Sequence, residues 1–128
     1  MLQNNLDFLS FNSQEELDSN AAQFIIKKAN KAIEEKGFFS LVLSGGTSPV
    51  NTYKILANEK VDFKNWFIYF GDERCLPIDH PERNSFVAKK IWLSKVNIPK
   101  SNIFSIPAEL GNIQGSLAYE QILNIKNE

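Results

Sequence analysis

The first loop with residue types suited to ligand binding spans residues 44–48 and reads Ser-Gly-Gly-Thr-Ser, directly before Pro49. Glycines let the backbone approach a ligand closely, and a helix N-terminus offers free N–H groups and a positive dipole end to an anion. The loop lacks the Gly-x4-Gly-Lys spacing of a Walker A motif. A site for a phosphate or for sugar oxygens is one interpretation, and a plain tight turn is the other. The candidate binding residues are Ser44, Gly45, Gly46, Thr47 and Ser48.

A second polar loop, residues 71–84, begins with Asp72, Glu73 and Arg74 directly after an apolar run. Charged side chains at such a place are costly to bury without partners, which favours a polar ligand. Arg74 could bind a phosphate through two parallel hydrogen bonds. Asp72 could accept hydrogen bonds from sugar hydroxyls or orient a catalytic imidazole. The alternative is a salt-bridged loop that only pins the edge of a sheet.

The same loop contains His80 and Cys75, which are the only histidine and the only cysteine of the chain. A lone histidine beside Pro81 is more typical of a loop-pinning residue than of a general base. A nucleophilic thiol would need a nearby base, so a half-buried structural thiol is expected. No spacing of His, Cys and carboxylate residues resembles a ligand set, so no metal site is predicted.

The elements that must position these loops follow from hydrophobic periodicity and capping signals. Ser13 and Glu16 have capping-box spacing, an apolar helical stripe follows, and Gly37 can end that helix. The continuous apolar runs after it read as buried strands. The expected strands are 6–11, 38–43, 66–70 and 102–106, and the expected helices are 14–36, 49–58, about 84–93 and 113–127.

Alternation of strands and helices predicts an α/β fold with three Rossmann-like layers: a mostly parallel sheet, buried on both faces by helices. Such sheets bind ligands at the carboxyl ends of their strands, and both polar loops fall there. Residues 1–128 are expected to form a single α/β domain.

Composition excludes several classes of protein. The chain is 43% hydrophobic and 23% charged with a net charge of −1, which argues against a general nucleic-acid binder. No apolar run approaches the roughly 20 residues of a membrane span, and no secretory signal is recognisable. The single cysteine fits a reducing compartment. A cytoplasmic protein with no nucleic-acid or membrane partner is expected.

Together, the two loops resemble the signatures of the 6-phosphogluconolactonase family. Residues 43–49 match the first signature and residues 71–77 the second, and residues 79–81, Asn84 and 102–107 also fit. The resemblance implies a Rossmann-like fold and cofactor-free hydrolysis of 6-phospho-D-glucono-1,5-lactone to 6-phosphogluconate, in the pentose phosphate pathway. It implies that the glycine loop, Arg74 and Asn84 hold the sugar-phosphate lactone and that Asp72 supports the reacting centre.

Two departures from the family pattern shape the expectation for this chain. The family's general base is a histidine in a later Gly-x-Gly…Asp-Gly-His segment, and residues 1–128 contain no such segment. They are therefore expected to correspond to the N-terminal half of a lactonase domain. Weak or absent lactonase activity is therefore expected of the chain alone. Arg83 stands where the family usually has serine, which bears on the local phosphate or hydroxyl contacts.

Two alternatives remain open at this point. A glucosamine-6-phosphate deaminase or isomerase-like enzyme is disfavoured, because that motif has an Asp-Glu-Tyr type sequence where this chain has Asp72, Glu73 and Arg74. A non-catalytic fragment that binds sugar phosphates is the other. Half of a parallel sheet leaves an unpaired edge, which favours a homo-oligomer or a complementing C-terminal half.

Overall fold

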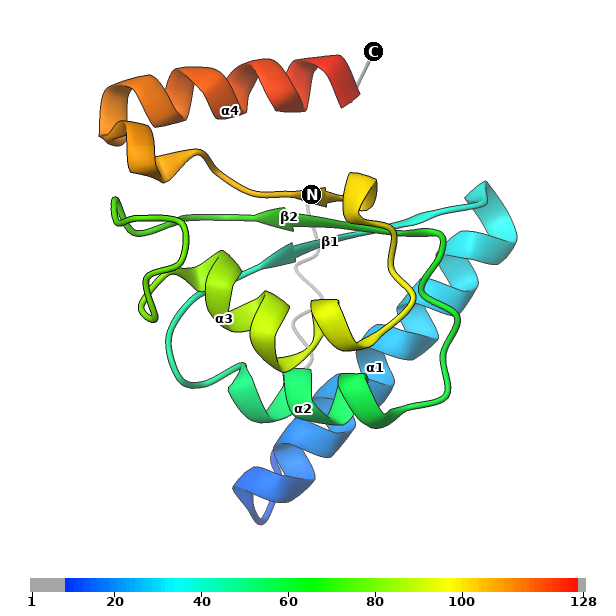
Figure 1. Ribbon diagram of the computed structural model, residues 1–128. Coiled ribbons are helices and arrows are strands. Elements are labelled where there is room, and N and C mark those ends of the chain that lie inside the picture. Colours follow the sequence, from blue (N-terminus) through cyan, green and yellow to red (C-terminus); the bar gives the residue numbers. More distant parts are fainter. Residues whose placement is uncertain (1–8, 127–128) are drawn as a thin grey trace, which may run out of the picture.

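The computed structural model describes residues 9–126, within which the strands form one parallel sheet of order β1-β2-β3. The strands are β1 (Phe39–Leu43), β2 (Trp66–Phe70) and β3 (Ile103–Phe104). Leu43 pairs with Phe70, and Tyr69 with Phe104, so the carboxyl ends of the strands meet at one edge (Figure 1). This arrangement confirms the predicted parallel α/β fold.

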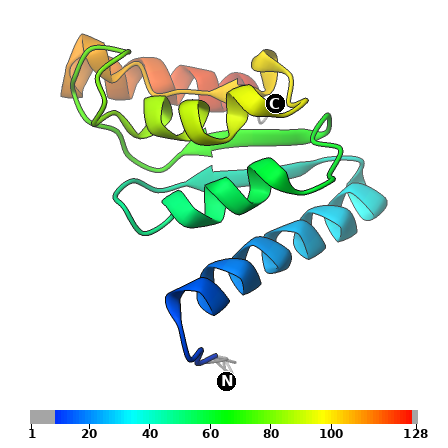
Figure 2. The same ribbon diagram turned by 60° about the horizontal axis from the view of Figure 1, so that its bottom comes forward.

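Helices lie on both sides of this sheet, which confirms the three layers. The long helices are α1 (Gln14–Lys36), α2 (Val50–Asn58), α3 (Asn84–Ile91) and α4 (Asn112–Lys126). In Figure 1 the strands lie between α4 above and α2 and α3 below, and Figure 2 shows α1 running along the β1 side. Among the helices of residues 9–126, none combines the length and apolarity that a membrane span requires.

The signals at both ends of α1 act much as the sequence predicts. The Ser13 hydroxyl accepts a hydrogen bond from the Glu16 N–H at 3.1 Å. The Glu16 carboxylate reaches back to the N–H of Asn12 at 3.2 Å, one residue beyond the usual partner in a capping box. Gly37 ends the helix with φ of 87°, and its N–H donates to the Ile33 carbonyl at 2.8 Å. Glycine is favoured at this position because a residue with a side chain adopts the left-handed conformation only at a cost.

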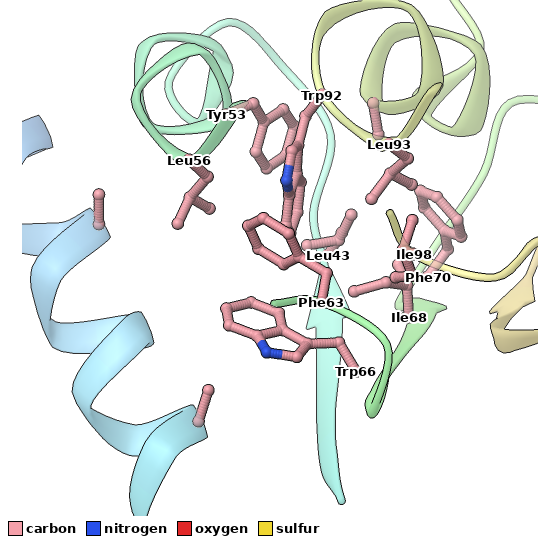
Figure 3. Packing of buried hydrophobic residues seen from close by; sticks show 13 residues of the cluster. Leu43, Tyr53, Leu56, Phe63, Trp66, Ile68, Phe70, Trp92, Leu93 and Ile98 are labelled. Carbon is pink, nitrogen blue, oxygen red and sulfur yellow. The ribbon is translucent and has the colours of Figure 1, made fainter. Parts of the chain in front are cut away.

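The core fills the space between the sheet and α1, α2 and α3 (Figure 3). Trp66 is fully buried, and its ring lies 4.7 Å from that of Phe63, centroid to centroid. Trp92 stacks on Tyr53 of α2 with centroids 5.7 Å apart. On β1 the other face is open, because Val42 is 63% exposed. The expectation that the strands are buried on both faces is therefore wrong for β1.

Several element boundaries differ from those expected. Residues 9–11 of the expected strand 6–11 are not in a strand, and the remainder lies outside the described residues. Pro49 precedes α2 as its N-cap instead of being its first residue, and no side chain caps this end. Helix α3 stops at Ile91, so Trp92 follows it, and the expected strand 102–106 is reduced to β3. Three short 3-10 turns were not anticipated: Leu93–Lys95, Lys100–Asn102 and Ala108–Leu110.

Tyr119 fastens α4 to the ends of β2 and β3. Its buried hydroxyl accepts a hydrogen bond from the Phe70 N–H at 3.0 Å and donates one to the Phe104 carbonyl at 3.1 Å. The side chain thus bridges two neighbouring strands where their own pairing ends. Burial raises the pKa of Tyr119, so the hydroxyl keeps its proton at neutral pH.

The Tyr119→Phe substitution is expected to lower the free energy of unfolding by about 2 kcal/mol, because it leaves the Phe70 N–H buried without a partner. Chemical denaturation measures this difference. Tyr69→Phe is the matched control, since the Tyr69 ring stacks on Phe104 with centroids 4.8 Å apart and that contact survives the change. Equal stability losses in the two variants would contradict a special role for the Tyr119 hydroxyl.

Candidate functional site

A pocket of about 290 Å³ lies at the carboxyl edge of the sheet, between the glycine loop, the first turn of α2 and the second polar loop. Parallel sheets bind ligands at this edge. The pocket lining brings together six of the residues singled out in the sequence: Ser44, Gly45, Gly46, Thr47, Arg74 and Asn84. Of the remaining candidates, Ser48 is exposed on the turn before α2 and Asp72 is exposed beside Asn84, and neither lines the pocket.

Asn84 joins the two loops. Its side-chain amide donates to the Asp72 carbonyl oxygen at 3.1 Å and to the Asp72 carboxylate at 3.3 Å. On its other side the Asn84 side chain lies directly against Gly45, where an added Cβ would overlap it. Gly46 has φ of 87°, a left-handed conformation that side chains disfavour. Glycine is therefore required at residue 45 by the closeness of Asn84 and at residue 46 by the positive φ.

Tyr53 and Glu82 also line the pocket, although neither was a candidate from the sequence. The Tyr53 hydroxyl donates to the Ser44 carbonyl at 3.1 Å, which anchors the start of the glycine loop to α2. Burial raises the pKa of Tyr53 to about 12, so it remains a donor at neutral pH. The signal that could have found it is helical spacing, since Val50 and Tyr53 are three residues apart on the turn that follows the loop.

Glu73 does not face the pocket; it caps α3. Its side chain is fully buried, and its carboxylate accepts hydrogen bonds from the N–H groups of Asn84 at 2.6 Å and Ser85 at 2.9 Å. It also accepts from the Arg74 N–H at 2.9 Å. Burial acts to raise the pKa of Glu73, but the N–H groups of Ser85 and Arg74 outweigh it, so this pKa is lowered. The salt-bridged interpretation of the loop is thus correct for Glu73.

Arg83 also points inward. Its guanidinium is buried beside Glu73, with 3.4 Å between Arg83 Nε and the nearer carboxylate oxygen, and it does not line the pocket. The residue that replaces the family's serine thus makes its contacts within the protein. Arg74, in contrast, is exposed and borders the pocket.

Neither His80 nor Cys75 is among the residues that line the pocket. His80 Nδ1 accepts a hydrogen bond from the Glu82 N–H at 3.1 Å, and the His80 carbonyl accepts one from the Arg83 N–H at 3.0 Å. These bonds pin the loop, as expected for this histidine. Cys75 is exposed, so the expected half-buried thiol is wrong. No group of metal-ligating side chains is found within residues 9–126.

The pocket lining combines a cationic side chain and hydroxyl groups with a carboxylate and an amide. Arg74, the hydroxyls of Ser44 and Thr47, and the uncapped start of α2 are suited to a phosphate. The Glu82 carboxylate and the Asn84 amide can bind hydroxyl groups. The lining contains no histidine that could activate water. Binding of a sugar phosphate is therefore the chemistry that this surface supports.

Residues 12–127 match the family model described as glucosamine-6-phosphate isomerases/6-phosphogluconolactonase. A 6-phosphogluconolactonase of Nostoc sp. is 36% identical over 111 residues, which cover 86% of this chain and 46% of that protein. A probable 6-phosphogluconolactonase of Arabidopsis thaliana is 34% identical, with 88% and 46% covered. The chain thus spans about half the length of these relatives.

Solved structures give the same result for the fold. The 6-phosphogluconolactonase from Thermotoga maritima superposes with a TM-score of 0.79 and 26% identity, covering 85% of this chain and 50% of that one. A monomeric glucosamine-6-phosphate deaminase superposes with a TM-score of 0.75 and 24% identity, covering 91% and 49%. At that identity the deaminase shows the shared fold alone.

Gly45→Ala is expected to displace the Asn84 side chain, because the new methyl group would occupy its place. Loss of the hydrogen bonds from Asn84 to Asp72 should cost about 1–3 kcal/mol of folding stability. The side-chain amide resonance of Asn84 and the denaturation midpoint report the change. Gly71→Ala is the control, since a Cβ there meets Val42 Cγ1 at an ordinary 3.5 Å. An unmoved Asn84 resonance in Gly45→Ala would contradict the steric account.

Glu73→Gln is expected to cost about 3–5 kcal/mol at pH 7, because it removes the fully buried carboxylate that faces Arg83 and leaves only the partly exposed Glu109 as an ionic partner. Since the native pKa of Glu73 lies below its ordinary 4.5, its contribution is present above about pH 4.5 and is lost as the pH falls toward the native value. The variant should therefore lose stability less steeply than the wild type below that pH, as measured by denaturation across a pH series. Glu120→Gln, on the exposed side of α4, is the control. Parallel pH profiles for wild type and Glu73→Gln would refute the assignment.

Proposed function

Because the chain belongs to the family of glucosamine-6-phosphate isomerases and 6-phosphogluconolactonases, we propose that it forms the sugar-phosphate-binding half of a 6-phosphogluconolactonase. The observation that carries the proposal is the pocket that unites the glycine loop, Arg74 and Asn84. The relatives at 30% identity or more that are described above are named 6-phosphogluconolactonases, which supports this substrate over an amino sugar.

In this proposal the phosphate of 6-phospho-D-glucono-1,5-lactone lies near Arg74 and the hydroxyls of Ser44 and Thr47. The Glu82 carboxylate accepts hydrogen bonds from ring hydroxyls. Asp72 acts at one remove, since its carbonyl and carboxylate hold the Asn84 amide at 3.1 and 3.3 Å. The contribution proposed for Asp72 is thus support of the site, with no direct part in the chemistry.

Lactone hydrolysis adds water to the ring carbonyl carbon, breaks the bond from that carbon to the ring oxygen, and leaves a carboxylate and a hydroxyl. A base that takes the proton from the attacking water contributes about 10²–10⁴-fold to the rate of such a step. His80 is an unsuitable base, because its Nδ1 accepts the Glu82 N–H and the ring does not line the pocket. The proposal therefore assigns binding to these residues and expects little turnover from them alone.

The free edge of β1 and the exposed sheet face beside it are the proposed place for a complementing half or a second copy. This strand pairs only with β2 within the described sheet, and Val42 on it is 63% exposed. An edge strand with unpaired backbone groups accepts a further strand readily. A cytoplasmic location is part of the proposal, because the substrate belongs to sugar-phosphate metabolism.

The proposal predicts that the chain binds 6-phosphogluconate, the reaction product, and that Arg74→Ala weakens this binding about 10- to 100-fold through loss of a charge-assisted contact. Isothermal titration calorimetry measures both dissociation constants. Lys95→Ala is the control, because it removes the same charge from an exposed site after α3 that is not part of the pocket.

Hydrolysis of the lactone, corrected for its spontaneous rate, completes the test. Wild type should show little or no added turnover, and ammonia release from glucosamine 6-phosphate should be absent. Equal binding by Arg74→Ala and wild type would refute the pocket. Full lactonase turnover that survives Arg74→Ala would refute the proposed division between binding and catalysis.

A further inference from the structure

The Arg83 side chain is a buried junction between the pocket loop and two later segments. Only 1% of the residue is exposed. Its Nη1 donates to the Leu76 carbonyl at 3.0 Å and to the Glu109 carboxylate at 3.2 Å. Its Nη2 donates to the Ile106 carbonyl at 3.0 Å and contacts the Ser85 hydroxyl at 3.4 Å. One guanidinium thus ties the second polar loop to the chain after β3 and to the turn that carries Glu109.

Glu73 transmits this anchoring to the pocket. The ion pair between Glu73 and Arg83 has both side chains at 2% exposure or less. The Arg83 Nε atom has no hydrogen-bond partner, so the contact there is electrostatic. The same carboxylate holds the N–H groups of Arg74 and Asn84, both of which border the pocket. A shift of Glu73 would therefore move two ligand-binding residues together.

Arg83 itself has no free donor to offer to a ligand among its Nη atoms, which are directed at the protein contacts above. Its chain neighbours Glu82 and Asn84 both line the pocket, whereas Arg83 does not. Burial of the middle residue thus fixes how the residues on either side are presented.

We propose that Arg83 is a positioning residue: its buried guanidinium, with Glu73 and Glu109, sets the geometry of Arg74 and Asn84 for binding a sugar phosphate. The inference rests on the proposed function for the identity of the ligand. It goes beyond that function because Arg83 and Glu109 act without touching the ligand, and Glu109 lies on Ala108–Leu110, outside the pocket lining.

Three variants separate this role from general stabilisation. Glu109→Gln removes one charge from a partly exposed partner without substituting any residue that lines the pocket. Arg83→Lys keeps the charge but lacks the fork that reaches three segments. Arg83→Met keeps much of the volume and removes both. Glu120→Gln is the control for Glu109→Gln, because Glu120 is exposed on α4.

The measurements are the dissociation constant for 6-phosphogluconate and the hydrogen-exchange rates of backbone amides at a temperature where each variant is folded. Glu109→Gln should weaken binding several-fold and Arg83→Met about tenfold or more, with faster exchange at Arg74, Asn84 and Ser85. Exchange within β1 and β2 should stay unchanged. Compared with Arg83→Met, Arg83→Lys should restore more of the wild-type melting temperature than of the wild-type affinity.

Wild-type affinity in Glu109→Gln and Arg83→Lys, with unchanged exchange at Asn84 and Ser85, would overturn the proposal even if Arg83→Met does not fold. Exchange that rises equally in β1, β2 and the pocket loop would overturn it too, since that pattern marks global destabilisation. If the wild type binds no 6-phosphogluconate, the proposed function fails, and the positioning role is then decided by the exchange rates alone.

Discussion

A fully buried carboxylate, that of Glu73, is the constraint on which the pocket depends. A negative charge without water must find donors, and here they are the first N–H groups of α3 and the N–H of Arg74, with Arg83 as the opposite charge. These partners come from both ends of a polar loop that has little regular structure. Satisfying one charge therefore fixes the path of the loop. It also places Arg74 and Asn84 at the pocket. Both residues bind Glu73 through their backbone N–H groups, so neither side chain is used in that contact.

The sheet supplies the second half of the arrangement. Register between β1 and β2 places Leu43 beside Phe70, so the glycine loop and the second polar loop start next to each other. Asn84 then seats against Gly45, while the Tyr53 hydroxyl holds the Ser44 carbonyl from α2. The binding surface proposed for a sugar phosphate is thus supported by the core residue Tyr53 on α2 and by Asn84 at the start of α3. This explains how loops at a sheet edge can form a defined site.

Much of the fold could be predicted, because apolar periodicity and capping residues act locally. Ser13 and Gly37 bound α1 as expected, and the continuous apolar run 66–70 is β2. The open face of β1 could not be predicted, since an apolar run does not tell which face has a partner. The meeting of the two polar loops could be predicted as well, because the carboxyl ends of parallel strands lie at one edge of a sheet. The roles of Glu73 and Arg83 could not be, because only the three-dimensional path of the chain shows that a charged side chain points inward.

The central claim is that a sugar phosphate binds at the junction of the two loops. The most direct measurement is a titration of the isotope-labelled wild-type chain with 6-phosphogluconate, followed by backbone amide resonances. The account predicts saturable shifts concentrated at Gly45, Gly46, Thr47, Arg74 and Asn84, with small changes along α1 and α4. Saturable shifts confined to another surface, or none at millimolar ligand in a folded sample, would contradict it.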